Sequence, residues 1–114
     1  MKLSYEDHGA ITVLKLKGEL VTDHTDLFRR SCHERFESGS RNVVLDLEEL
    51  KYVDSAGLES LLWLQEETAG LNGQLRLVGL DPTIAKILEI TRLDRRFSVH
   101  ASIESAAKEL RKRT

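Results

Sequence analysis

The chain has 114 residues, with 17 Lys and Arg against 19 Asp and Glu, and 40% of its residues are hydrophobic. A chain of this length buries roughly two-thirds of the surface that its unfolded state exposes, so we expect one domain over residues 1–114 and exclude a two-domain enzyme. The net charge of −2 argues against nucleic acid as a partner, because phosphate neutralisation needs a basic excess on one face.

The first half of the chain predicts two strands, a helix and a third strand. Apolar β-favouring residues indicate strands over 3–5 and 11–16, the second ended by Gly18. Apolar residues three to four apart predict a helix from Asp23 to about Glu37, with Asp23 or Thr25 able to cap its start. The apolar run over 42–47 is typical of a strand covered on both faces, and we expect it at the centre of the sheet.

The second half repeats the alternation of helix and strand. We expect a helix over 58–69, a turn over 70–73, a strand over 74–78 and a short strand over 97–99. Asp81 before Pro82 predicts a capped helix start, and Ser102 can cap a last helix. The inner stripe of the third helix is Ile84, Ile87, Leu88 and Thr91. The alternation predicts an α/β fold: a mixed sheet of about four to five strands flanked by about four helices.

The segment over 45–62 carries the most information about function. A buried strand leads through a short polar connection and Val53 into a helix that begins near Ser55. Ser55 could be only the N-cap, because serine is preferred there. However, Leu58 stands where a capping box needs Glu or Gln, and Gly57 disfavours the first turn by up to about 1 kcal/mol. We therefore interpret the small residues Ala56 and Gly57 as leaving the Ser55 hydroxyl open to another molecule.

A phosphoryl group would suit the position of Ser55. It would bring about −1.5 to −2 charge to the positive end of the helix dipole, so the fold would tolerate it. A partner packed over Ser55 would have to desolvate that charge beside Asp54, and like-charge repulsion would release the interface. The sequence thus predicts a docking surface that phosphorylation switches off.

Trp63 is a second candidate for partner contact. At about 100° per residue, Trp63 lies opposite the apolar side of its helix, near Ala56, Glu59, Ser60 and Glu67. Aromatic residues are enriched at interfaces, so an outward tryptophan can contact a partner. Alternatively, it covers a neighbouring loop or lies flat on the surface.

The sequence also offers a hydrolase reading. Ser55-Ala56-Gly57 matches the second half of G-x-S-x-G, and Asp81 or Asp94 followed by His100 gives the chain order Ser, Asp, His. Val53 stands where that motif needs glycine, and there is no HGGG-like oxyanion segment, so we expect no enzyme.

The histidines and glycines indicate no bound group. His8, His24, His33 and His100 show no metal-ligand spacing, and the glycines form no phosphate-binding loop, so we expect neither metal nor cofactor. The single cysteine, Cys32, cannot form an internal disulfide, and no stretch approaches the roughly 18 to 20 apolar residues of a membrane span. We therefore expect a cytoplasmic protein without membrane insertion.

Four segments resemble a known family: GEL at 18–20, VVLDLEEL at 43–50, VDSAGL at 53–58 and GQLRLVGLDPTIAKILEITRLDRRF at 73–97. From residue 3 to about 110 the chain resembles the STAS domain, specifically stand-alone bacterial anti-sigma factor antagonists. The resemblance implies that Ser55 is phosphorylated by a partner that is both anti-sigma factor and serine kinase, and that phosphorylation blocks binding. It also implies that the unmodified antagonist frees a sigma factor and that a PP2C-type phosphatase restores it.

The docking surface expected around Ser55 comprises seven residues: Asp23, Asp54, Ala56, Gly57, Leu58, Glu59 and Trp63. One position departs from the family, because many antagonists carry an acidic residue where this chain has Val21, and Asp23 is the candidate substitute. STAS domains also serve as subunits of lipid-transport and other signalling complexes in which the serine need not be modified, and this alternative stays open. We expect a monomer or weak dimer.

Overall fold

The mixed sheet and the flanking helices are confirmed by the computed structural model, which describes residues 1–112. The strands are β1 (Lys2–His8), β2 (Ile11–Leu20), β3 (Asn42–Val53), β4 (Leu75–Val78) and β5 (Ser98–His100). The helices are α1 (Thr25–Glu37), α2 (Ser55–Gly70), α3 (Pro82–Ile90) and α4 (Ile103–Arg111), and the 3-10 turn η1 (Thr22–His24) precedes α1. The strand order is β1-β2-β3-β4-β5, with β1 antiparallel to β2 and the other neighbours parallel.

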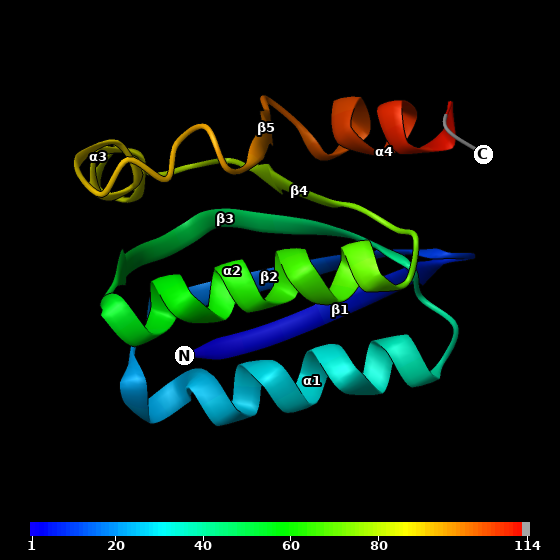
Figure 1. Cartoon of the computed structure of the whole chain (residues 1–114), viewed down its shortest axis with the longest axis horizontal. Coiled ribbons are helices and arrows are strands. Elements are labelled where there is room, and N and C mark those ends of the chain that lie inside the picture. The colour runs from blue at the N-terminus through cyan, green and yellow to red at the C-terminus, as the bar shows by residue number, and fades with distance from the viewer. Residues whose placement is uncertain (113–114) are drawn as a thin grey trace.

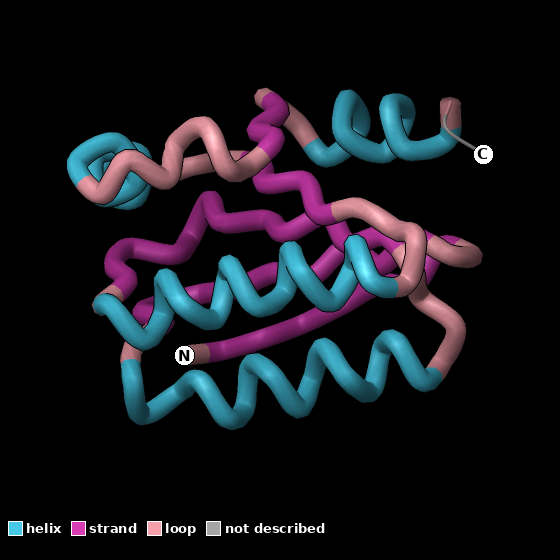
Figure 2. Tube along the Cα trace, viewed as in Figure 1, coloured by secondary structure: helices cyan, strands magenta, loops and turns pink. Residues whose placement is uncertain are grey.

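The two faces of the sheet carry cores of different size. The larger core joins the sheet to α1, α2 and α3 through residues such as Phe28, Leu61 and Ile84. The smaller core joins the other face to α4 through Ala106 and Leu110. Figures 1 and 2 show α1 and α2 running side by side, with the longer strands between them and α4. No helix of residues 1–112 combines the length and apolarity needed to cross a membrane.

Strands β2 and β3 are longer than predicted. We expected Gly18 to end the second strand, but β2 continues to Leu20. Gly18 has a φ of 102° and lies at a register shift between β2 and β3, so the glycine bends the strand instead of ending it. The polar stretch after Leu47 is also strand, because β3 runs on to Val53. The ends of both strands, which are paired at Leu20 and Val53, therefore lie at the same edge of the sheet.

Local capping signals were read correctly for the last two helices and wrongly for the first. Asp81 accepts a hydrogen bond from the Thr83 N–H at 2.9 Å, and Ser102 accepts one from the Ser105 N–H at 3.1 Å. The N-cap position of α1 belongs to His24, whose side chain makes no capping hydrogen bond. The prediction that Asp23 or Thr25 caps α1 is therefore wrong, because the preceding 3-10 turn carries the chain into the helix.

The inner stripe of α3 was predicted one residue too long. Ile84 and Leu88 are buried, and Ile87 is half-buried against the core. Thr91 is exposed, because it lies at the C-cap of α3, where its hydroxyl donates to the Ile87 carbonyl at 2.8 Å.

Candidate functional site

Two connections meet where β2 and β3 end. Residues 21–24 lead from β2 into α1, and Asp54 leads from β3 into α2. Since the strands are parallel, both connections leave the same edge of the sheet, and this end of α2 lies beside the turn before α1 in Figure 1. Loops at the carboxyl ends of parallel strands are a common place for binding sites.

Asp54, and not Ser55, is the N-cap of α2. One carboxylate oxygen of Asp54, Oδ1, accepts a hydrogen bond from the Gly57 N–H at 2.8 Å. The alternative explanation of Ser55, that it serves only as the N-cap, is therefore wrong. Ser55 is the first residue of the helix, and its side chain is exposed. Its hydroxyl is consequently not required to start α2.

The second oxygen of Asp54 ties α2 to the turn that precedes α1. Oδ2 accepts hydrogen bonds from the Thr22 N–H at 2.9 Å and from the Thr22 hydroxyl at 3.0 Å. The Gly57 N–H, followed by the Thr22 N–H, holds the pKa of the Asp54 carboxyl below its usual range, since these donors favour the charged form. Asp54 is therefore a fixed negative charge directly before Ser55.

The structure explains why position 57 is a glycine, which the sequence alone did not reveal. A Cβ at this position would lie 2.1 Å from the carbonyl oxygen of Leu20, and the residue is buried. The close approach that we assigned to an incoming molecule is thus made by the end of β2. Gly57 lets the start of α2 press against that strand, while Ser55 lies on the exposed side of the first turn.

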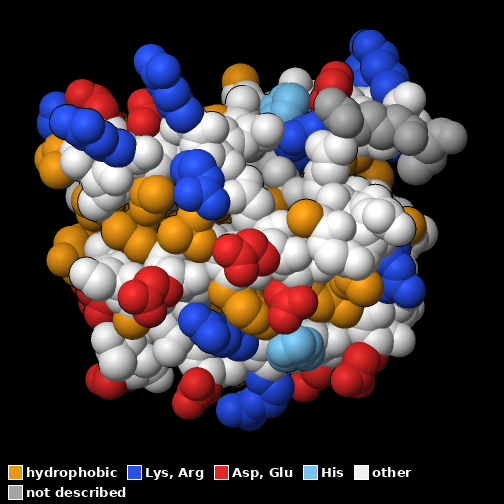
Figure 3. All heavy atoms as spheres, in the orientation of Figure 1, with side chains coloured by type: hydrophobic (Ala, Val, Ile, Leu, Met, Phe, Trp, Pro, Cys, Tyr) orange, Lys and Arg blue, Asp and Glu red, His pale blue; other side chains and the backbone are white. Residues whose placement is uncertain are grey.

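The remaining residues predicted near Ser55 differ in exposure. Asp23 and Glu59 are exposed, the first on η1 and the second one turn after Ser55 along α2. Ala56 is half-buried, and Leu58 is half-buried against the main core. Val21, where the resemblance led us to expect an acidic residue, is a half-buried residue at the start of η1. Acidic side chains are scattered among apolar ones on the face seen in Figure 3.

Trp63 is not the outward-facing residue that we predicted. It is half-buried, with the His33 ring 5.2 Å from its own and the Arg29 guanidinium 5.2 Å from its ring centroid. Ser60, also expected on the open side, is fully buried and accepts a hydrogen bond from Arg29 Nε at 3.4 Å. Helix α1 covers this side of α2, so the helical period alone placed the wrong face in solvent.

Sequence reasoning missed Thr22 and the Leu20 carbonyl as parts of the site. Thr22 lies 32 residues before its partner Asp54. The local signal was a threonine two residues after the end of β2, and this signal does not identify a partner. Only the pairing of β2 with β3 brings these residues together.

The serine-hydrolase arrangement is not formed among the described residues. His100 contacts the Ser105 hydroxyl at 3.3 Å, and Asp81 caps α3, so neither forms a hydrogen bond with Ser55. Asp94 is exposed in the segment before β5. The other nucleophile, Cys32, is buried in the core, and burial raises the pKa of its thiol to about 12.

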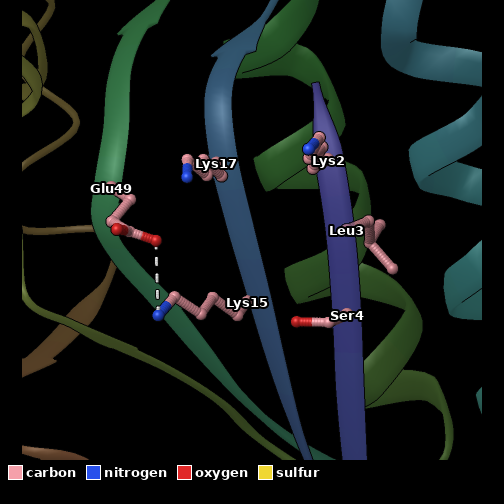
Figure 4. Close-up of a pocket in the computed structure, with 6 residues that line it drawn as sticks. All are labelled: Lys2, Leu3, Ser4, Lys15, Lys17 and Glu49. Atoms are coloured by element: carbon pink, nitrogen blue, oxygen red, sulfur yellow. Dashed lines mark ion pairs between the residues drawn. The ribbon is translucent and has the colours of Figure 1, made fainter.

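A cavity lies on the face of the sheet that points away from α1 and α2. An open hollow of about 460 Å³ is lined by Lys2, Leu3, Ser4, Lys15, Lys17 and Glu49. Figure 4 shows the Lys15 and Glu49 side chains meeting across neighbouring strands, and their ion pair is 3.3 Å long. These residues include none of those predicted around Ser55. Within residues 1–112, no cluster of three or more His, Cys, Asp or Glu side chains could hold a metal ion.

Known proteins share both the sequence pattern and the fold. BtrV of Bordetella bronchiseptica, named as an anti-sigma factor antagonist, is 30% identical over 94% of this chain and 92% of its own. The TM1081 structure from Thermotoga maritima superposes with a TM-score of 0.87 at 22% identity, covering 96% of this chain and 94% of that one.

The same fold occurs in the anti-sigma factor antagonist SpoIIAA. Its unphosphorylated form has a TM-score of 0.84 at 21% identity, with 97% of both chains covered. The phosphorylated Bacillus form has a TM-score of 0.74 at 22% identity, covering 95% of this chain and 98% of that one. The sequence profile of the STAS domain matches residues 2–106. With a family match over nearly its whole length, the chain belongs to the STAS domain family.

Proposed function

We propose that this chain is an anti-sigma factor antagonist whose Ser55 accepts a phosphoryl group from its partner. The observation that carries the proposal is the exposure of Ser55 at the first position of α2, with capping supplied by Asp54 instead. BtrV and SpoIIAA, which carry the name of anti-sigma factor antagonists, support it. A structure of SpoIIAA in a phosphorylated form supports the modification.

The proposed reaction transfers the γ-phosphoryl group of ATP to the Ser55 hydroxyl. A new P–O bond forms to Ser55 Oγ, the bond to ADP breaks, and the hydroxyl proton leaves to a base on the kinase. All of the catalytic machinery belongs to the partner kinase, which is also the anti-sigma factor. The antagonist itself supplies only an accessible acceptor on a rigid helix start.

Phosphorylation would act on the interface and not on the fold. The added charge of about −1.5 to −2 lies at the positive end of the α2 dipole, which favours it. A partner covering Ser55 would have to bury that charge beside the Asp54 carboxylate and close to Asp23 and Glu59. The unmodified protein therefore binds the kinase and frees a sigma factor, whereas the phosphorylated protein dissociates.

The cycle implies further partners and a compartment. A PP2C-type phosphatase would remove the phosphoryl group and return the antagonist to its binding form. Since kinase, phosphatase and sigma factor act on transcription, the protein would work in the bacterial cytoplasm.

A constitutive STAS subunit of a transporter or other signalling complex is the second candidate function. It is the weaker one, because the chain covers 92% of BtrV and 97% of SpoIIAA, and the names of both proteins are those of anti-sigma factor antagonists, not of transporter subunits. A permease and an ATPase encoded beside this chain would favour it, and a kinase or phosphatase neighbour would favour the switch.

The direct test is a phosphorylation assay with the serine kinases of the anti-sigma type encoded in the same genome. The wild type and Ser55→Ala are each incubated with one kinase and ATP, and the modified residue is mapped by mass spectrometry. We expect one kinase to modify Ser55 and to leave Ser55→Ala unlabelled. Full labelling of Ser55→Ala would reject Ser55 as the acceptor.

A further inference from the structure

Some of the N–H groups at the start of α2 already donate hydrogen bonds within the chain and are not available to an anion. A helix start presents four N–H groups without an intrahelical acceptor, and phosphoryl groups commonly bind there. In α2, the Asp54 N–H donates to the Leu20 carbonyl at 3.4 Å, and the Gly57 N–H donates to the Asp54 carboxylate at 2.8 Å. The amides that remain for a phosphoryl group are those of Ser55 and Ala56.

The Asp54 carboxylate is also held from the other side. Its second oxygen accepts both the N–H and the hydroxyl of Thr22, at 2.9 and 3.0 Å. To release the Gly57 amide, Asp54 would have to rotate and give up all three hydrogen bonds. Gly57 is packed against the Leu20 carbonyl, so its amide has no room to shift towards the end of β2.

We propose that Asp54, held in place by Thr22, keeps a phosphoryl group on Ser55 outside the first turn of α2 and turned towards solvent. Asp54 and Thr22 are therefore positioning residues of the switch, and the inference rests on the proposed phosphorylation of Ser55. The charge of an outward phosphoryl group is not neutralised by the Gly57 amide and stays at the docking surface. It also stays within reach of a phosphatase, which makes the switch reversible.

The electrostatic setting follows from the elements that meet at the site. The segments that meet here, residues 19–26 and 51–59, contain Asp54 and seven other titratable residues: Glu19, Asp23, His24, Asp26, Lys51, Tyr52 and Glu59. Lys51 forms an ion pair with Asp81 at 3.2 Å, away from α2. Asp54 is the carboxylate adjacent to Ser55 in the chain and fixed by three donors, so it should dominate the repulsion that a phosphoryl group experiences.

The test uses the full chain with phosphoserine introduced at position 55 by genetic encoding, so it requires no cognate kinase. The second pKa of the phosphoserine, ordinarily about 6, is measured by ³¹P NMR titration in the wild type, Asp54→Asn and Glu59→Gln. Asparagine keeps a capping side chain at position 54, so α2 should still form. Glu59→Gln is the matched control, since it removes one exposed carboxylate that does not hold the helix start.

We expect the phosphoserine pKa to be highest in the wild type and to fall by about one unit in Asp54→Asn, because a carboxylate a few ångströms away opposes the second negative charge. Glu59→Gln should lower it by less. In ¹H–¹⁵N spectra of the wild type, the Ser55 and Ala56 amides should follow the phosphate titration while the Gly57 amide stays in place. A Gly57 amide that titrates with the phosphate, or a phosphoserine pKa equal in wild type and Asp54→Asn, would overturn the proposal.

Thr22 is tested with a second pair of variants on the same phosphoserine protein. Thr22→Val removes the hydroxyl donor, and Thr22→Ser retains it. We expect the Gly57 amide to begin following the phosphate in Thr22→Val and to remain in place in Thr22→Ser. The same spectrum in both variants would exclude Thr22 from the positioning role. Because phosphoserine is built in, these outcomes are independent of whether a kinase modifies Ser55.

Discussion

Helices α2 and α3 begin alike but differ in the charge that they present. Each follows a parallel strand at the same edge of the sheet, and each is capped by an aspartate, Asp54 or Asp81. Backbone N–H donors lower the pKa of both carboxyls, led by Gly57 for Asp54 and by Thr83 for Asp81. Asp81, however, also meets the Lys51 ammonium at 3.2 Å, whereas Asp54 meets the neutral donors of Thr22.

This difference separates a structural helix start from a candidate switch. At α3, a lysine balances the cap, and Pro82 and Thr83 occupy the first turn. At α2, the cap keeps its negative charge, and an exposed serine follows it. A phosphoryl group on Ser55 would therefore add a second negative charge beside Asp54 at the proposed docking surface. The capping geometry alone does not distinguish the two helices.

The third position of each helix gives the largest expected effect. In α3 it is Ile84, a fully buried side chain, whereas in α2 it is Gly57, where a Cβ would lie 2.1 Å from the Leu20 carbonyl. Gly57→Ala should destabilise the protein by about 1 to 3 kcal/mol, since the packed helix start must shift. Urea unfolding measures the change.

The matched control for that substitution is Gly70→Ala at the other end of α2, where a Cβ would meet nothing within 4 Å. It should be neutral or stabilising by up to about 1 kcal/mol. If the two alanine variants had the same stability, the packing of Gly57 against β2 would be wrong.

The two caps should differ when each is removed. Asp54→Ala deprives the Gly57 N–H and both Thr22 donors of their acceptor, whereas Asp81→Ala deprives the Thr83 N–H and a surface ion pair of theirs. Since exposed ion pairs contribute little, Asp54→Ala should lower the urea midpoint more. A larger drop for Asp81→Ala would reverse the comparison.

Lowering the pH should reduce the free energy of unfolding through the same two carboxyls, Asp54 and Asp81, with a smaller effect than the substitutions above. Their folded pKa values lie below the ordinary 3.8, so the stability that they contribute is present above that value and is lost as pH falls through it towards the folded pKa. Asp54→Asn and Asp81→Asn should each flatten the decline in unfolding free energy below about pH 4.

Repeating the acid experiment at higher salt concentration should distinguish the two carboxyls. Part of the Asp81 shift is attraction to Lys51, which salt screens, whereas the Asp54 shift comes from hydrogen bonds to neutral groups. Added salt should therefore shrink the effect of Asp81→Asn more than that of Asp54→Asn. An equal response of both variants to salt would show that the two caps are electrostatically alike.

The sequence predicted what depends on neighbours in the chain. The Asp81-Pro82 start and the Ser102 cap follow from short-range hydrogen bonds, and both were found. Features that depend on distant segments were missed or misread. Gly57 is explained by Leu20, and Trp63 faces α1 instead of solvent. Helical periodicity finds one apolar stripe, but α2 is covered both by the sheet and by α1, so its buried side is wider than the pattern shows.

The most direct test of the account compares partner binding with folding in one protein. The chain carrying encoded phosphoserine at position 55 and the unmodified chain are compared in their affinity for the proposed partner kinase and in their free energy of unfolding. We expect phosphorylation to weaken binding by about 100-fold or more while changing stability by less than about 1 kcal/mol. Equal affinities, or a phosphorylated protein that unfolds, would contradict the claim that α2 begins with an interface switch on a tolerant fold.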